Sequence, residues 1–373
     1  MLAREGLEGA LAARTSISLI RGAQGRLAYR GYSIDELAEN AGFEEVVYLL
    51  WFGDLPARKA LAKFSDQLKA NRNPPQPVLQ MIRSGLASAD PMDALRTAVS
   101  MLASSDPDVA DNSEDSDLRK GVRLSAAMPT LVAFHSRLRR NLAPVAPDPE
   151  LGHAENFLYM VTGQRPSPAE GRAINAAMTL RADHGLDAST FAARVTAGTH
   201  SDLHSALTSA IGTLKGPLHG GAVSGVMEML LAIGEKSRAK QTIDKMLKAK
   251  KKIPGFGHRI YKGADPRAVQ FKRICERLSA AAANRGWFEL PSYVEKMVHR
   301  RTGLSPNVDF YCAPAYHMLG IATDDFAPVF ACSRAPGWIA HVVEQHSDHR
   351  LIRLVEEYIG LLPRAFVPLD ERA

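Results

Sequence analysis

Two histidines stand in glycine-rich turns, where a side chain can meet a substrate at close range. His219 lies in the run 216–221, GPLHGG, and His258 lies in the run 254–259, PGFGHR. Glycine permits tight turns and close approach of a ligand to the backbone. A helix that begins after Gly221 would aim its N-terminal N–H groups at the same place. A lone histidine is more often structural, but two in such turns, about 40 residues apart, favour a functional site.

A carboxylate and a guanidinium further along the chain are ambiguous when each is taken alone. Asp309, in SPNVDFYCAP, lies between apolar residues, where burial would disfavour its charged form and suit it to general-base work. It could equally be a helix cap. Arg334, in CSRAPGW, could bind a carboxylate through two hydrogen bonds or could form only a salt bridge before a helix.

The composition is that of an ordinary globular protein and excludes several classes. Of 373 residues, 46% are hydrophobic and 23% are charged, with 46 Lys and Arg against 40 Asp and Glu, a formal net charge of +6. Disordered, collagen-like and membrane-spanning chains have different compositions. The length allows two or three domains, or one large helical unit with a smaller lobe.

The cysteines and the N-terminus indicate a cytoplasmic protein. Cys275, Cys312 and Cys332 are too few for a disulfide framework and too far apart for a CxxC element. They suggest no metal site. The N-terminus lacks the apolar stretch of a signal peptide, and no segment offers the ~18 consecutive apolar residues of a membrane helix.

A basic run extends over residues 236–252, with eight Lys and Arg and a single acid, Asp244. Such runs are usually solvated faces. The functional alternative is attraction of a polyanion. No nucleic-acid-binding motif is recognisable and aromatic residues are not interleaved for base stacking, so a phosphorylated small molecule fits at least as well as nucleic acid.

Helical periodicity dominates the elements that must carry these residues. Strand-like runs are scarce, with one short hairpin expected near 17–32 around Gly22 and Gly25. The chain is therefore predicted to be mainly α. The expected helices cover 33–56 as one or two helices, 91–102, 119–140, 151–163, 168–181, 200–213, 221–234, 265–285, 313–321, 336–346 and 349–360.

Seven motifs, in the same order along the chain, resemble those of the citrate synthase family, which includes the 2-methylcitrate synthases. The resemblance runs from about residue 6 to 360. Seven motifs in order are far more specific than one. They read GLEGALAARTSIS…GRLAYRGYSIDELAENAGFEEVVYLLWFGDLP, MDALRTAVSML, ADHGLDASTFAARV, AIGTLKGPLHGGAV, PGFGHRIYKGADPRA, NVDFYCAPAYHMLGI and SRAPGWIAHVVEQ.

The resemblance implies an all-α fold with two domains and a homodimer. The large helical domain would comprise 1–219 and 315–373, with dimer contacts in its C-terminal part. The smaller, mobile helical domain, 220–314, would lie on the acyl-CoA side and close over the substrates. Closure would exclude water and strengthen the polar interactions inside.

The resemblance also implies catalytic roles. Asp309 matches the base that removes a proton from the methyl carbon of acetyl-CoA, and His219 matches the group that stabilises the enol or enolate at the thioester oxygen. His258 matches the group that polarises the keto carbonyl of oxaloacetate. The product, citryl-CoA, is hydrolysed to citrate and CoA, a reaction of the tricarboxylic acid cycle.

The remaining site residues follow from the same resemblance. Arg267, Arg334 and Arg353 match a guanidinium cluster for the two carboxylates of oxaloacetate, and His184 also contacts that substrate. In the family the residue matching Arg353 comes from the neighbouring subunit, which implies active sites shared across the dimer. The resemblance implies that Lys262 contacts the phosphates of CoA. It favours the same role for the basic run only slightly. No cofactor or metal is implied, because acetyl-CoA is a cosubstrate.

Several departures from the family pattern predict a divergent member. Asp187 stands where Asn is usual and adds a negative charge near His184, while Leu354 and Val355 replace a proline and an arginine after Arg353. Other departures are Val223-Ser224 in place of Asn-Glu and Cys312-Ala313 in place of Ser-Gly.

Three functions are consistent with these motifs. The leading one is citrate synthase. A 2-methylcitrate synthase using propionyl-CoA is the alternative enzyme, because one methylene changes pocket binding by only ~1–3 kcal/mol. The third is an inactive paralogue that binds CoA or an oxo acid, against which the intact set His219, His258, Asp309, Arg267 and Arg334 argues.

Overall fold

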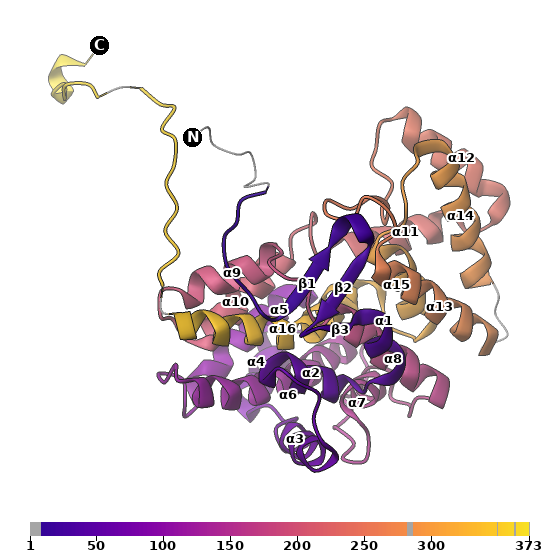
Figure 1. The fold of residues 1–373 in the computed structure, drawn as a ribbon, viewed down its shortest axis with the longest axis horizontal. Coiled ribbons are helices and arrows are strands. Elements are labelled where there is room, and N and C mark those ends of the chain that lie inside the picture. The colour runs from indigo at the N-terminus through magenta and orange to yellow at the C-terminus, as the bar shows by residue number, and fades with distance from the viewer. Residues whose placement is uncertain (1–8, 282–285, 349, 362, 373) are drawn as a thin grey trace.

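The computed structural model of the chain describes residues 9–281, 286–348, 350–361 and 363–372 (Figure 1). Helices dominate, and the sheet in these residues has three antiparallel strands in the order β1-β2-β3. The strands are β1 (Ser18–Arg21), β2 (Arg26–Tyr29) and β3 (Tyr32–Ser33). Ser18 pairs with Tyr29, so the predicted hairpin is confirmed, as is the all-α class.

The first half of the chain forms eight α-helices, which build most of the main helical body. They are α1 (Ile34–Asn40), α2 (Phe43–Phe52), α3 (Arg58–Ala70), α4 (Gln76–Met81), α5 (Pro91–Leu102), α6 (Glu114–Arg139), α7 (His153–Thr162) and α8 (Pro168–Arg181).

The second half also forms eight described α-helices. They are α9 (Ala188–Ala197), α10 (Leu203–Leu214), α11 (Ala222–Ile233), α12 (Lys236–Lys248), α13 (Pro266–Ala281), α14 (Gly286–Thr302), α15 (Val308–Met318) and α16 (Phe326–Asp348). Single-turn elements lie at Gly22–Gln24, Ile82–Leu86, Ala103–Ser105, Thr323–Asp325 and Leu369–Glu371.

Side-chain caps set the start of the helices that carry candidate site residues. Asp187 caps α9 by accepting the backbone N–H of Thr190 at 3.0 Å. Asn307 caps α15 by accepting the N–H of Asp309 at 3.0 Å. A cap satisfies backbone donors that have no partner within the helix. Asp309 itself is therefore not the cap, but a first-turn residue of α15.

Helix α16 is the centre of the core. Most of its residues are buried, including Trp338 at 0% exposure, and α6, α9 and α10 pack around it. The predicted helix 336–346 is only its second half, since α16 passes through Pro336. The predicted helix 313–321 likewise begins too late, because α15 passes through Pro314. Burial on every side outweighs the loss of one hydrogen bond at each proline.

The predicted helix 349–360 is wrong. Residues 350–360 are not helical, and residue 349 lies outside the described residues. The segment leaves the body as an extended tail (Figure 1), with Val355 at 93% and Ile359 at 91% exposure. Amphipathic helices are stabilised mainly by packing their apolar face. The described residues provide no such packing for this segment.

Helices α12 and α14 lie together at one end of the molecule (Figure 1), and neither was predicted from the sequence. The predicted helix 265–285 corresponds to α13, with 282–285 outside the described residues. Helix α13 packs against α15 on one side and against α8 of the main body on another. The proposed boundaries of a small domain, 220–314, remain a prediction.

At Gly337, α16 packs closely against the loop that follows α8. A Cβ atom there would lie 2.3 Å from the carbonyl oxygen of Ala182 and 2.7 Å from Asp183 Oδ1. Gly337→Ala should therefore lower the free energy of unfolding by about 1–3 kcal/mol. Gly225→Ala in α11 is the matched control, because its Cβ would meet only Pro254, at 3.9 Å; it should be neutral or stabilising by up to about 1 kcal/mol. Urea denaturation of both variants measures the contrast, and equal stabilities would contradict it.

Candidate active site

His184, His258 and Tyr261 form a cluster of rings between the loop after α8 and the loop before α13. The imidazoles of His184 and His258 meet edge to face, with centroids 5.5 Å apart. His184 Nε2 is 3.1 Å from the Tyr261 hydroxyl. Burial, with the cations Arg267 and Arg334 nearby, lowers the pKa of His184 well below its ordinary value. His184 is therefore a neutral, oriented imidazole.

The local backbone determines which nitrogen of His258 carries the proton. Nδ1 accepts the N–H groups of Ile260 at 3.0 Å and Tyr261 at 3.3 Å. Burial, followed by the charge of Arg267, lowers the pKa of His258. A neutral imidazole with Nδ1 accepting bears its proton on Nε2. His258 can thus donate a hydrogen bond from Nε2 to a carbonyl oxygen.

Arg267 is held by Asp265 through two parallel hydrogen bonds. Nε donates to Oδ1 at 3.0 Å and Nη2 to Oδ2 at 2.9 Å, and both side chains are buried. Asp265 Oδ2 also accepts the backbone N–H of Val308 at 3.0 Å. This aspartate therefore fixes the guanidinium and ties the start of α13 to the start of α15, the turn that carries Asp309.

Asp187 joins two of the predicted site residues. Its Oδ2 accepts from Nη1 of Arg334, and its Oδ1 lies 3.5 Å from Nε2 of His219. Burial alone would raise the pKa of Asp187, but the Arg334 guanidinium and His219 outweigh burial and hold it well below its usual value. The unusual aspartate is therefore ionised and compensates a buried arginine, an arrangement that the sequence did not predict.

The hydrogen bonds around Ser189 place a proton on Nε2 of His219. The Ser189 hydroxyl donates to Asp187 Oδ1 at 2.8 Å and accepts from Trp338 Nε1 at 3.2 Å. Since its single proton is committed to Asp187, Ser189 can only accept from His219 Nε2, 2.9 Å away. His219 can then donate from Nδ1 to a ligand only as the doubly protonated imidazolium, whose charge Asp187 would balance.

Asp309 lies opposite a buried arginine that the sequence reasoning missed. Its Oδ1 accepts from Nη2 of Arg181 at 2.6 Å, and 14% of the Asp309 side chain is exposed. The carbonyl oxygen of Arg181 in turn accepts from Nε of Arg334 at 2.7 Å. The only sequence signal for Arg181 was its place three residues before His184.

A path of hydrogen bonds and close polar contacts, with one peptide bond between Val308 and Asp309, therefore links most of the candidates. It starts at His258, whose Nε2 lies 3.4 Å from Arg267 Nη2 in a close contact between two donors rather than a hydrogen bond, and ends at His219. The intermediate residues are Arg267, Asp265, Val308, Asp309, Arg181, Arg334 and Asp187.

Three predicted site residues are not on this path: His184, which packs edge to face against His258, and Arg353 and Lys262. Arg353 is exposed on the C-terminal tail, where its neighbours are Glu356 at 3.8 Å and the carbonyl of Leu354. Lys262 is exposed in the loop of His258 and donates to the Arg259 carbonyl at 3.4 Å.

The basic run is chiefly the solvated face of α12. Lys240 pairs with Asp244 at 3.0 Å, Arg301 of α14 also contacts Asp244, and Lys236 pairs with Glu289 at 2.5 Å. Only Ala239 and Ile243 of α12 are buried. This arrangement favours the solvated-face interpretation for the helical part of the run.

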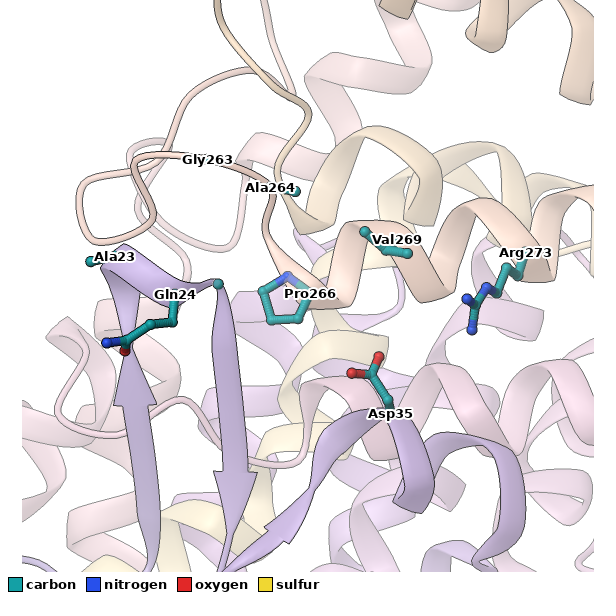
Figure 2. Close-up of a pocket in the computed structure, with 9 residues that line it drawn as sticks. Ala23, Gln24, Asp35, Gly263, Ala264, Pro266, Val269 and Arg273 are labelled. Atoms are coloured by element: carbon teal, nitrogen blue, oxygen red, sulfur yellow. The ribbon is translucent and has the colours of Figure 1, made fainter.

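The β-hairpin braces the loop that carries His258. A Cβ atom on Gly22 would lie 2.4 Å from the carbonyl oxygen of Ile260, so the hairpin tip packs directly on that loop. Beside this contact is a cavity of about 540 Å³. Figure 2 shows its wall formed by the hairpin tip and Gly263–Ala264 on one side, and by Asp35 and Arg273 on the other.

The described residues contain neither a membrane-spanning helix nor a cluster of metal ligands. None of the helices in this part of the chain is long and apolar enough to cross a membrane. In the same residues, His, Cys, Asp and Glu side chains form no group of three or more that could hold a metal ion.

The fold and these groups define a helical acid–base enzyme suited to an anionic carbonyl substrate. The profile of the citrate synthase C-terminal domain matches residues 6–354. The chain belongs to the citrate synthase family of acyltransferases.

Individual relatives agree with this assignment. Citrate synthase 2 of Bacillus subtilis is 47% identical over 100% of both chains. A 2-methylcitrate synthase of Mycobacterium tuberculosis H37Rv is 40% identical over 97% of this chain and 93% of its own.

Solved structures share the fold. The citrate synthase of Pyrobaculum aerophilum has a TM-score of 0.91 at 40% identity, covering 99% of this chain and 95% of its own. A ternary complex of carboxymethyl coenzyme A and oxaloacetate with the citrate synthase of Thermoplasma acidophilum has a TM-score of 0.92 at 32% identity, covering 99% of each chain.

The neutral state of His184 predicts how stability depends on pH. Because its folded pKa is lowered, the unfolded chain binds one proton more as pH falls below about 6.5, and the stability gained at higher pH is lost. Replacing His184 removes this term. The stability of His184→Gln should therefore fall less steeply below that pH than that of the wild type, by up to about 1.4 kcal/mol per pH unit. Urea unfolding at a series of pH values measures both slopes, and identical slopes would exclude a buried neutral His184.

Proposed function

We propose that the protein is a citrate synthase that condenses acetyl-CoA with oxaloacetate and water to give citrate and CoA. The observation that supports it is the connected path from His258 to His219, which includes Asp309 and three arginines, in a member of this family. Each group on the path has a chemical type and local environment suited to one part of the reaction.

The first step is formation of the nucleophile. Asp309 removes a proton from the methyl carbon of acetyl-CoA while His219 donates from Nδ1 to the thioester oxygen, where negative charge develops. A base on the carbon and a donor on the oxygen together lower the cost of forming the enol or enolate. The ionised Asp187 balances the imidazolium charge that this donation requires of His219.

The second step is attack on the keto carbon of oxaloacetate. His258, neutral and protonated on Nε2, donates to the keto oxygen and polarises the carbonyl. Arg267, Arg334 and His184 bind the oxaloacetate carboxylates and orient the carbonyl. Citryl-CoA forms, and hydrolysis of its thioester releases citrate and CoA.

The remaining parts of the site come from outside the connected path. Lys262 contacts a phosphate of CoA, for which its exposed ammonium is available, and the lobe 220–314 closes over both substrates. Arg353 completes the oxaloacetate site of a partner subunit in a homodimer. The tail that carries Arg353 supports this arrangement, because apolar side chains such as Val355 and Ile359 are exposed in the single chain.

Members of the family differ in the acyl-CoA that they use. Relatives named 2-methylcitrate synthase are about as similar to this chain, at 40% identity, as several named citrate synthase. The alternative function is therefore condensation of propionyl-CoA with oxaloacetate.

Release of CoA thiol from each acyl-CoA in the presence of oxaloacetate tests the proposal. Acetyl-CoA should give the higher kcat/KM, and Asp309→Ala should abolish turnover while oxaloacetate binding stays measurable by calorimetry. A strong propionyl-CoA preference would establish the alternative. No release from either substrate would refute both enzyme functions and leave the binding paralogue.

Mixed dimers test the shared site. Asp309→Ala and Arg353→Ala should each be weakly active or inactive alone. A dimer with one chain of each type regains one site with both residues intact, because Arg353 reaches that site from the Asp309→Ala chain. Co-expressed, tandem-purified mixed dimers should therefore recover up to about half the wild-type kcat. Activity no higher than that of the separate variants would place Arg353 outside the partner's site.

A further inference from the structure

Arg181, the last residue of α8, is fully buried and yet leaves most of its donors unused. Its side chain is 0% exposed, and Nη2 donates to Asp309. In the part of the chain that the structure describes, Nε and Nη1 have no hydrogen-bond partner. The buried Cys312 thiol also interacts with Arg181, but a thiol is a weak acceptor. Burying a guanidinium so incompletely satisfied costs stability, which calls for a functional explanation.

The surroundings of Arg181 hold its guanidinium in one place. It lies over the ring of Phe330, 4.3 Å from the centroid, and 5.9 Å from the centroid of Phe271. Such stacking on aromatic faces suits the planar guanidinium. The donor of the hydrogen bond to Asp309 is therefore fixed in position. If the carboxylate rotated, the guanidinium could not move with it and the hydrogen bond would be lost.

The pair leaves the two carboxylate oxygens of Asp309 unequal. Oδ1 accepts from Nη2 of Arg181 at 2.6 Å, whereas Oδ2 has no hydrogen-bond partner among the described residues. We propose that Arg181 is a positioning residue for the catalytic base, which fixes Oδ1 and presents Oδ2 to the acyl-CoA. This inference rests on the proposed function.

The proton transfer balances without any further group. The C–H bond of the acyl methyl breaks, its electron pair forms the enolate with charge on the thioester oxygen, and the proton passes to Oδ2. Arg181 stays protonated throughout, since an arginine does not deprotonate in proteins. Its part is to keep the reacting oxygen aligned, and a misplacement of about 1 Å can lower a rate about 100-fold.

The side chain and the backbone of Arg181 have separable roles. The carbonyl oxygen supports Arg334, the proposed oxaloacetate ligand, and a side-chain substitution leaves it in place. Loss of the guanidinium should therefore affect the proton-transfer step and spare oxaloacetate binding.

Three variants make this separation measurable. Arg181→Met keeps an unbranched chain between the two rings without the donor, and Arg181→Lys keeps a charged donor. Arg72→Met is the matched control, because Arg72 is 2% exposed and its Nη atoms donate only to the carbonyls of Asp148 and Leu151, both at 2.9 Å. Each is assayed by CoA release with acetyl-CoA and with acetyl-CoA deuterated at the methyl group, alongside thermal unfolding.

Arg181→Met should lower kcat roughly 10- to 100-fold, keep the KM for oxaloacetate within about twofold, and show a larger deuterium isotope effect than the wild type. Arg181→Lys should regain part of kcat. Arg72→Met should lose stability but keep the wild-type kcat and isotope effect.

An unchanged isotope effect in Arg181→Met, or a loss confined to the KM for oxaloacetate, would overturn the inference. If Arg181→Met does not fold, Arg181→Lys decides, because its displaced donor should also raise the isotope effect. If the wild type and Arg72→Met both release no CoA, the proposed function fails instead.

Discussion

The positive charges of three buried guanidinium groups must each be balanced by a carboxylate, and this constraint organises the site. Arg181, Arg267 and Arg334 are each at most 3% exposed, and each has one aspartate: Asp309, Asp265 and Asp187, respectively. An unpaired buried charge costs several kcal/mol, so the three pairs must form together as the helices pack. The Arg181–Asp309 pair joins α8 to α15, and the Arg334–Asp187 pair joins α16 to the start of α9. Asp265, the partner of Arg267, joins α13 to α15 by accepting the N–H of Val308. The fold therefore fixes the orientation of all three guanidinium groups.

The pairing also explains one departure from the family pattern, the aspartate at position 187. Asp187 in place of the usual asparagine puts a full negative charge between Arg334 and His219. It weakens the net attraction of Arg334 for a carboxylate, but it also fixes the proton on Nε2 of His219 through Ser189. One residue therefore offsets the charge of a buried arginine and, through Ser189, also determines which nitrogen of His219 is protonated.

The elements around the site act chiefly as supports. The β-hairpin tip presses on the loop of His258, and the caps Asp187 and Asn307 begin the two helices that carry Ser189 and Asp309. By contrast, few of the described residues contact the tail after α16, and its apolar side chains Val355 and Ile359 are exposed.

By itself, the sequence determined the helical class, the hairpin, the family and the chemical candidates, because periodicity, glycine-rich turns and ordered motifs are local properties of the chain. Only the tertiary structure decided which charges meet. Arg181 and Asp309 are separated by 128 positions, and Arg334 and Asp187 by 147, so no local pattern pairs them. Tertiary packing also carried α15 and α16 through prolines. Residues 350–360, periodic in sequence, stayed extended because their apolar side chains are left exposed by the described part of the chain.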